Sequence, residues 1–278
     1  MRPRRERRRK DDRSMTLKST TRRAKAVLRG LVNRRRNPLP VLAWSDTPRC
    51  FGRYLFICGA HRSGTTLLES ALRVRCSFVG LEGPVPENEG IHLQDVYTGG
   101  GVGQFGLEWP LEPPPPDTAP ELRRRLLSRW TPWMTGEGEA LLEKSPPNLT
   151  KIAWLRAVFP GARFLVLARD PRVVSASTSK WVHYEIPMLM QNWDRAYATA
   201  WADLDTDCAV LTYEAFCVDP EGEIDRVIEA LDLPVRDRPL PMPDRYRVLR
   251  NSNASYLSKF EGMTFGPGSW RNYGYDFD

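Results

Sequence analysis

A glycine-bearing turn follows the first strongly apolar segment of the chain. Residues 54–58 (Tyr-Leu-Phe-Ile-Cys) form an apolar run of strand length, and residues 59–66 (Gly-Ala-His-Arg-Ser-Gly-Thr-Thr) follow it directly. From Gly64 onward, apolar residues recur at helical spacing. Glycines let the backbone approach an anion closely, and the N–H groups that open a helix supply positive potential. The segment therefore predicts a phosphate-binding loop between a strand and a helix.

The residue types in this loop disfavour ATP chemistry. An ATPase loop carries lysine directly after its second glycine, where this chain has Thr65. The best candidate strand for a Mg²⁺-binding aspartate, 164–168, runs into Arg169 first. Arg62, inside the loop, supplies the positive charge instead. We expect an anion site that requires no metal.

A second candidate anion site lies at the end of another apolar run. Arg169 follows the expected strand 163–168, and Asp170-Pro171 begins a helix. Ser177 comes eight residues after Arg169, about two turns along that helix. An arginine fork and a hydroxyl can bind the same phosphate. Two separate anion sites predict a ligand with two separated phosphate groups.

The elements that must position these residues alternate along the chain. Strands are expected at 54–58, 77–81, 140–143, 163–168 and 208–212, and helices at 64–72, 121–133, 148–158, from 171, at 187–204 and at 220–231. Asn148 is expected to cap its helix. The alternation predicts an α/β, P-loop-containing three-layer fold with a central, mostly parallel sheet flanked by helices. Ligands of such sheets bind at the carboxyl ends of the strands, where both motifs fall.

The chain divides by composition into a basic extension and a folded part. Residues 1–36 hold 16 basic and three acidic residues, a formal charge of +13, whereas the other 242 residues hold 25 basic and 31 acidic residues, a charge of −6. We expect residues 1–50 to be a disordered extension and linker, and residues 51–278 to form one domain. Because the folded part is acidic, no specific nucleic-acid partner is expected.

The cysteine pattern and the hydropathy of the chain indicate in which cellular compartment the protein is expected. The five cysteines are scattered without a CxxC pair, and the three histidines fit no zinc spacing. No apolar run approaches the about 20 residues of a membrane helix, and no secretory signal is visible. We expect a cytoplasmic protein in a reducing compartment, with the basic extension open to a targeting role.

Together, these motifs resemble the sulfotransferases that use 3′-phosphoadenosine-5′-phosphosulfate (PAPS). Residues 59–66 are similar to their 5′-phosphosulfate loop in its tyrosylprotein sulfotransferase and bacterial form, although His61 replaces the usual proline. Arg169 and Ser177 match the 3′-phosphate pair. Residues 143–146 (Glu-Lys-Ser-Pro) and 211–216 (Leu-Thr-Tyr-Glu-Ala-Phe) resemble two further family segments. The resemblance covers about residues 53–232.

The resemblance implies PAPS as co-substrate and assigns roles to individual residues. The expected cofactor-binding residues are His61, Arg62, Ser63, Gly64, Thr65, Thr66, Arg169, Ser177, Trp181 and Tyr213. Trp181 and Tyr213 are candidates for contact with adenine. The expected catalytic residues are Arg62, Glu82, Glu89, His92 and Lys144, of which Lys144 would stabilise the sulfuryl oxygens.

The general base is left open between several side chains. A base must remove the acceptor proton, and Glu82 lies near where tyrosylprotein sulfotransferases keep a catalytic glutamate. The following loop offers Glu87, Glu89 and His92 as rivals, and His61 is a further candidate. We rank Glu82 and Glu89 above His92.

The expected function is transfer of a sulfuryl group from PAPS to a hydroxyl, or an amine, by in-line displacement. A P-loop small-molecule kinase and a catalytically silent nucleotide- or glycan-binding protein are the alternatives. Carbohydrate, phenol, other small molecules and peptide tyrosine stay open as acceptors, and the sequence does not indicate an oligomeric state. Residues 265–271 (Phe-Gly-Pro-Gly-Ser-Trp-Arg) loosely resemble the loop that covers PAPS in cytosolic sulfotransferases, with a plain C-terminal turn as the alternative.

Overall fold

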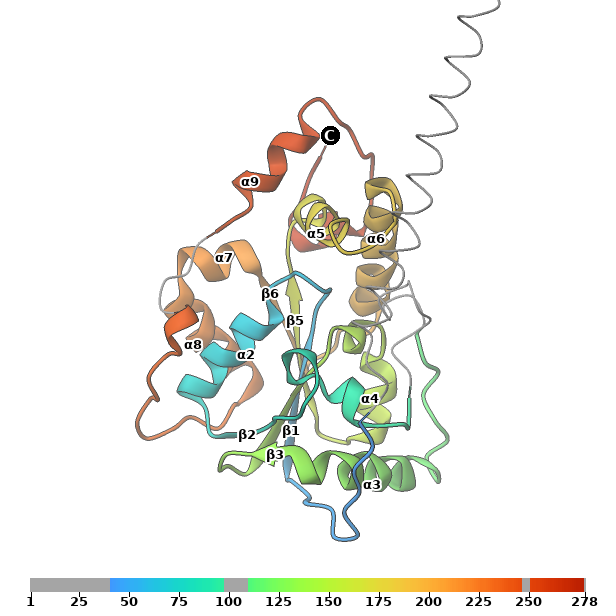
Figure 1. Ribbon diagram of the computed structural model, residues 1–278, viewed down its shortest axis with the longest axis vertical. Coiled ribbons are helices and arrows are strands. Elements are labelled where there is room, and N and C mark those ends of the chain that lie inside the picture. The colour runs from blue at the N-terminus through green and yellow to red at the C-terminus, as the bar shows by residue number, and fades with distance from the viewer. Residues whose placement is uncertain (1–40, 98–109, 247–250, 278) are drawn as a thin grey trace, which may run out of the picture.

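A six-stranded sheet forms the centre of the molecule in the computed structural model, which describes residues 41–97, 110–246 and 251–277 (Figure 1). The strands are β1 (Arg53–Cys58), β2 (Phe78–Leu81), β3 (Met134–Thr135), β4 (Ala140–Lys144), β5 (Arg163–Ala168) and β6 (Cys208–Thr212). Their order across the sheet is β3-β2-β4-β1-β5-β6. Only the short edge strand β3 runs antiparallel to its neighbour, so the described sheet is mostly parallel, as predicted.

Helices connect the strands in the manner that parallel pairing requires. The α-helices are α2 (Thr65–Arg75), α3 (Ala119–Trp130), α4 (Ile152–Val158), α5 (Pro171–Thr178), α6 (Ile186–Ala202), α7 (Tyr213–Val218), α8 (Pro220–Leu231) and α9 (Ala254–Leu257). Short 3₁₀ turns occur at Pro86–Asn88, Gly90–Leu93, Thr131–Trp133, Pro146–Thr150, Asp244–Tyr246, Ser258–Phe260 and Ser269–Tyr273.

Alternation along the central strands divides the core into two layers. In β1, Leu55 and Ile57 pack with residues of α2, α7 and α8, whereas Tyr54 and Phe56 pack with residues of α3, α4 and α6. Successive side chains of a strand point to opposite faces of the sheet, so a strand covered on both faces must be apolar throughout. Figure 1 shows α2 and α8 on one side of the sheet and α3 and α4 on the other. The three-layer prediction is confirmed.

The predicted strands are confirmed, but the short strand β3 was not predicted, and one predicted helix cap is wrong. Asn148 does not cap α4, because it lies in the preceding 3₁₀ turn, and Lys151 occupies the cap position. The amide of Asn148 instead donates to Glu143 and accepts from the hydroxyl of Tyr97. Helix α7 was not expected as a separate element. Its side-chain cap is Thr212, whose hydroxyl accepts from the N–H of Ala215 at 3.2 Å.

The C-terminal residues pack on α6. The Ser269 N–H donates to Asp194, and the Tyr273 hydroxyl donates to the carbonyl of Tyr197. Trp270 is buried against Phe277. The expected basic extension lies outside the described residues up to residue 40.

No helix in the described part of the chain is both long enough and apolar enough to span a membrane. The same residues contain no group of three His, Cys, Asp or Glu side chains arranged to hold a metal ion.

Candidate active site

The carboxyl ends of the parallel strands bring the predicted residues to one edge of the sheet. The loop at 59–66 follows β1, Lys144 ends β4, Arg169 follows β5 and Tyr213 follows β6. Glu82 follows β2 at the same edge. Because β4, β1, β5 and β6 are consecutive neighbours in the sheet, these side chains surround a shared region above β1.

The loop after β1 is a tight concave turn. Arg62 and Gly64 have positive φ angles of 70° and 103°, and left-handed residues of this kind turn successive N–H groups toward one point. A Cβ atom at Gly59 would lie 2.8 Å from the carbonyl oxygen of Leu167, and one at Gly64 would lie 2.7 Å from the Tyr213 ring. Both positions therefore require glycine, because the loop lies directly against β5 and α7.

The start of α2 is left open for an anion. Gly64 is its N-cap residue and makes no side-chain capping hydrogen bond. The buried Ser63 directs its hydroxyl to the Ala60 carbonyl at 2.6 Å rather than to the helix. The first N–H groups of a helix need acceptors from outside the helix, which makes those of Thr65 and Thr66 candidate donors to an anion.

Arg62 reaches across the loop to the helix that follows Arg169. Its Nε donates to the Ser177 hydroxyl at 3.1 Å, and its guanidinium lies 5.7 Å from the ring centre of Trp181. The other four N–H groups of this guanidinium have no acceptor among the described residues. They are available to an anion held by the loop.

Arg169 points toward the loop and is buried. Its Nη1 donates to the Arg62 carbonyl at 3.0 Å, which ties the two predicted anion sites together. Nε and Nη2 donate to the Asn253 side chain, and Nη2 also donates to Ser252 at 3.0 Å. The guanidinium stacks 4.0 Å from the ring centre of Tyr213. Sequence reasoning missed Ser252 and Asn253, because more than 80 residues separate them from Arg169.

Two further polar side chains adjoin Ser177. The Tyr256 hydroxyl accepts from Lys180 Nζ at 3.1 Å. Its hydrogen bond with Ser177, followed by the contact with Lys180, lowers the pKa of Tyr256. Neither Lys180 nor Tyr256 carried a motif that would have identified it from sequence.

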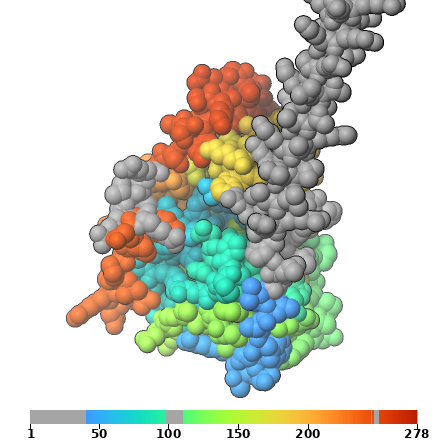
Figure 2. Space-filling model, in the orientation of Figure 1, coloured from blue at the N-terminus to red at the C-terminus, as the bar shows by residue number. Residues whose placement is uncertain are grey.

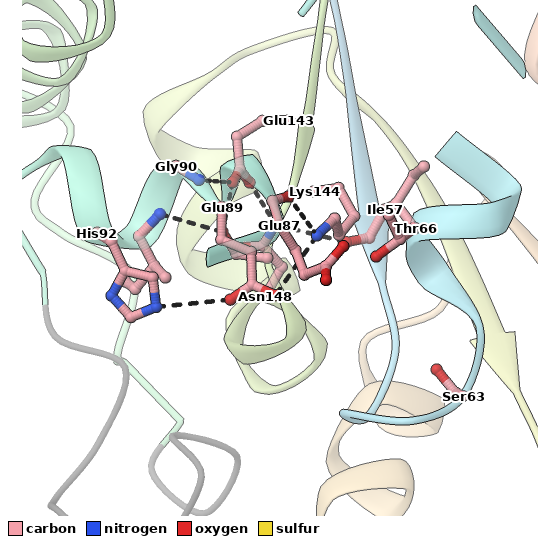
Figure 3. Close-up of polar contacts among 12 residues, drawn as sticks. Ile57, Ser63, Thr66, Glu87, Glu89, Gly90, His92, Glu143, Lys144 and Asn148 are labelled. Carbon is pink, nitrogen blue, oxygen red and sulfur yellow. Dashed lines mark hydrogen bonds and ion pairs between the residues drawn. The ribbon is translucent and has the colours of Figure 1, made fainter. Parts of the chain in front are cut away.

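Lys144 and Glu89 are buried side by side, and the backbone carbonyl of the exposed Glu87 completes their contacts. Figure 3 shows the ammonium group of Lys144 reaching from the end of β4, where it donates to the Glu87 carbonyl at 2.9 Å and pairs with Glu89 at 3.4 Å. Glu89 also faces His92 Nε2 at 3.6 Å. Burial alone would raise the pKa of Glu89, but His92 and the charge of Lys144 outweigh it and lower that pKa. Glu89 is therefore a carboxylate at neutral pH.

A second buried carboxyl group holds this loop in place. Glu143 accepts from the Gly90 N–H at 3.0 Å and from the side chains of Ser145 and Asn148. Burial raises the pKa of Glu143 despite these donors. The contacts fasten the 3₁₀ turn that follows Glu89 to the end of β4 and so fix Glu89 beside Lys144.

The remaining candidate residues occupy different surroundings. Glu82 is half exposed and pairs with Arg73 at 3.2 Å. His61 lies close enough to Glu89 for its charge to lower the pKa of that carboxyl. Trp181 is partly exposed, whereas Tyr213 is buried beneath the loop. The structure thus joins Arg62, Ser177 and Arg169 in one cluster and Lys144, Glu89 and His92 in another.

Residues 55–237, more than half of the chain, match the profile of the Sulfotransferase family. The chain belongs to the sulfotransferase family. This is a family of transferases that use PAPS, so membership implies PAPS as the co-substrate.

Comparison with individual sulfotransferases gives more distant likenesses. Protein-tyrosine sulfotransferase A from Caenorhabditis elegans is 26% identical over 205 residues, which cover 67% of this chain and 52% of that protein. The chain therefore spans about half the length of this curated relative.

Two solved sulfotransferase domains resemble the chain at low sequence identity. One comes from the olefin synthase of Synechococcus PCC 7002, with a TM-score of 0.46, 16% identity and coverage of 85% of this chain and 99% of that domain. The other comes from the curacin biosynthetic pathway, with a TM-score of 0.48, 13% identity and coverage of 84% and 100%. The sheet topology and the family match, rather than these scores, establish the sulfotransferase fold.

Proposed function

We propose that this chain transfers the sulfuryl group of PAPS to a hydroxyl group of an acceptor by in-line displacement. The carrying observation is the pair of hydrogen bonds from Arg169 to the Arg62 carbonyl and from Arg62 to Ser177. They join two cationic sites in one region at the strand ends. A nucleotide with phosphate groups at both its 5′ and 3′ positions needs such a pair of sites.

The donors present fit the two ends of this nucleotide. At the 5′ end, the open start of α2 and the unused N–H groups of Arg62 suit a phosphosulfate. At the 3′ end, Ser177 and Arg169 supply a hydroxyl and a guanidinium. The contacts of Arg169 with Ser252 are ordinary hydrogen bonds, which a phosphate oxygen can replace.

Sulfuryl transfer needs charge stabilisation and positioning more than covalent participation. Arg62 is assigned to the charge that develops on the departing phosphate, because Ser177 is the one side-chain hydrogen-bond partner of its guanidinium among the described residues. Lys144 is assigned to the sulfuryl oxygens. An ammonium has three N–H donors, and its described contacts use two of them.

Glu89 is the assigned general base. Its carboxylate is held beside Lys144 and is unprotonated at neutral pH, since its pKa is lowered. The contact with His92 orients the carboxylate. Glu82 lacks this position, because it pairs with Arg73 at the partly exposed surface. Any hydroxyl that reaches Glu89 could serve as acceptor, including the protein tyrosine named for the nematode relative.

Mass spectrometry tests the reaction directly. The protein is incubated with PAPS and a panel of phenols, sugars and tyrosine peptides, and products are searched for the gain of one sulfuryl group. The proposal predicts a sulfated product with PAPS and no phosphorylated product with ATP and Mg²⁺. Binding of 3′-phosphoadenosine 5′-phosphate (PAP) without any product across the panel would support a silent nucleotide-binding protein instead.

A further inference from the structure

A cavity of about 530 Å³ lies along the outer side of α2, next to the proposed sulfuryl site. In Figure 2 the cyan surface of α2 lies between the turquoise residues that follow β2 and the orange residues of the C-terminal part. The volume of the cavity falls in the range of about 300–1,000 Å³ that is usual for small-molecule sites. The residues that line it are Thr66, Glu69, Ser70, Arg73, Val74, Glu82, Glu87, Asn88, Leu240, Pro241 and Pro243.

The cavity adjoins the end of the anion loop and the turn that packs on Lys144. Thr66 belongs to the first turn of α2, directly after the anion loop. Glu87 accepts a hydrogen bond from Lys144 through its carbonyl at 2.9 Å. Figure 3 shows Thr66 and Glu87 on either side of the Lys144 ammonium. Lys144 itself is buried behind this lining, so a molecule in the cavity lies one residue away from the group assigned to the sulfuryl oxygens.

Glu69 is an unsatisfied carboxyl group in the wall of this cavity. Only 9% of the residue is exposed, and no donor among the described residues makes a hydrogen bond or an ion pair with its carboxyl. Buried carboxyl groups are costly unless they are paired. Burial accordingly raises the pKa of Glu69 to about 7, although Lys144 and Arg73 act in the opposite direction. A ligand that supplies a cation would remove this cost.

The charges around the cavity are unequal. Arg73 is its one cationic lining residue within the described chain, and Glu82 neutralises it at 3.2 Å. The carboxyl groups of Glu69 and Glu87 are then left without a cationic partner in the lining. Leu240, Pro241 and Pro243 make one wall apolar. The lining suits a molecule with an ammonium group and an apolar face, and it repels an anion.

We propose that this cavity is the acceptor site and that it takes small hydroxylated amines, with the ammonium group at Glu69 and the hydroxyl toward Lys144. The assignment rests on the proposed function, because it places the acceptor beside the proposed sulfuryl site. It narrows the acceptors from any molecule with a hydroxyl group to molecules that also carry a positively charged group.

Matched acceptors that differ only in charge test this assignment. Tyramine, 4-ethylphenol and 3-(4-hydroxyphenyl)propionate share a phenol, and glucosamine, N-acetylglucosamine and glucuronate share a pyranose. Turnover with PAPS is measured by mass spectrometry, and binding to the PAP-loaded protein is measured by calorimetry. We expect the cationic member of each set to have a kcat/KM at least about tenfold above that of the anionic member, since like charges repel in a desolvated site.

The Glu69→Gln variant keeps the shape of the side chain and removes its charge. We expect it to bring the preference for the cation to within about twofold while the affinity for PAP stays unchanged. Glu229→Gln, at an exposed position on α8, is the matched control and keeps the full preference. A second variant, Ser70→Trp, fills the cavity and is expected to abolish turnover of tyramine while PAP still binds.

The outcomes separate the acceptor site from the proposed function. Intact PAP binding with no preference for the amines, no binding of tyramine, or an unchanged preference in Glu69→Gln would each overturn the acceptor site alone. If the wild-type protein did not bind PAP, the result would contradict the proposed function itself.

Discussion

Arg62 combines an unusual backbone conformation with a guanidinium that makes one hydrogen bond, to Ser177, within the part of the chain that the structure describes. Its φ of 70° lies in the left-handed region, which non-glycine residues seldom adopt away from functional sites. In this conformation, the carbonyl oxygen of Arg62 accepts a hydrogen bond from Arg169, and the side chain of Arg62 donates one to Ser177. One residue thus contacts both anion sites, which makes it the most informative position to substitute.

We expect Arg62→Ala to lower turnover more than it weakens PAP binding. If the guanidinium acts on charge that develops in the transition state, kcat should fall about 10²–10³-fold, while PAP affinity falls about tenfold. Steady-state kinetics and calorimetry on the same preparation measure the two effects. Arg195→Ala, at an exposed position on α6, is the control. Equal losses in turnover and binding would make Arg62 a binding residue only.

Lys144 offers a second test at single-residue scale. Lys144→Met removes the ammonium but keeps a long apolar side chain, so we expect kcat to fall about 100-fold with little change in PAP affinity. Lys259→Met, at an exposed position, controls for the loss of a positive charge. Because the substitution leaves Glu89 buried without its cation, thermal melting accompanies the kinetics. A folded variant with wild-type kcat would remove Lys144 from the mechanism.

Helix α2 joins the anion loop to the acceptor cavity. Its N-terminal turn is held at Gly64 against Tyr213, and its outer face carries Glu69 and Ser70 into the cavity. Its inner face packs Leu68 and Leu72 against the sheet. A change at either end of this helix should therefore affect a different ligand.

The contact between Gly64 and Tyr213 predicts the effect of one added methyl group. Gly64→Ala combines the strain of a left-handed alanine with a clash against the ring at 2.7 Å. Gly161→Ala has a similar φ of 80° but meets nothing within 4 Å, so it isolates the strain of about 1–2 kcal/mol. We expect urea unfolding to show a loss for Gly64→Ala that exceeds the control by about 1–3 kcal/mol, together with weaker PAP binding. Equal losses would show that the ring moves aside freely.

Glu69 makes the stability of the protein depend on pH. Its folded pKa of about 7 exceeds the ordinary value of 4.5, so the folded state holds its proton more tightly than the unfolded state. The free energy of unfolding should then fall as pH rises from 4.5 to 7 and level off above that, by a total of about 3 kcal/mol from this group.

The Glu69→Gln substitution isolates this contribution. It should match the wild-type stability at pH 4 and exceed it at pH 8, as measured by urea unfolding at both values. Other groups around it, namely Arg73, Glu82, Glu87, Glu89, Glu143 and Lys144, are common to both proteins and cancel in the comparison. An identical pH dependence in the two proteins would contradict the burial of this carboxyl.

At the scale of the whole molecule, the parallel sheet gathers residues far apart in sequence at one edge. Apolar runs and helix signals predicted every described strand except the short edge strand β3, and most helices, because burial on both faces demands continuous hydrophobicity in a strand. The loop at 59–66 and the Arg169–Ser177 pair were predicted for the same reason, since each follows a recognisable strand. Local sequence patterns thus predict the fold and the sheet edge at which the candidate site residues gather.

Contacts between distant loops were not predictable in this way. The hydrogen bond from Asn253 to Arg169 joins residues 84 positions apart, and no periodicity marks it. Asparagine is a residue type that often caps helices, yet the side chain of Asn148 donates to Glu143 instead. Likewise, sequence left Glu82 and Glu89 equal as bases, and only the fold of the intervening turn brings one of them against Lys144.

The most direct measurement compares the affinities of PAP and adenosine 5′-monophosphate for the wild-type protein and for Arg169→Ala. The two nucleotides differ by the 3′-phosphate alone, so the comparison isolates the second anion site. We predict that the wild type binds PAP about 10–150-fold more tightly, the equivalent of about 1.5–3 kcal/mol for charge-assisted hydrogen bonds, and that Arg169→Ala abolishes this difference. Equal affinity of the wild type for both nucleotides, or an equal loss for both in the variant, would contradict the account.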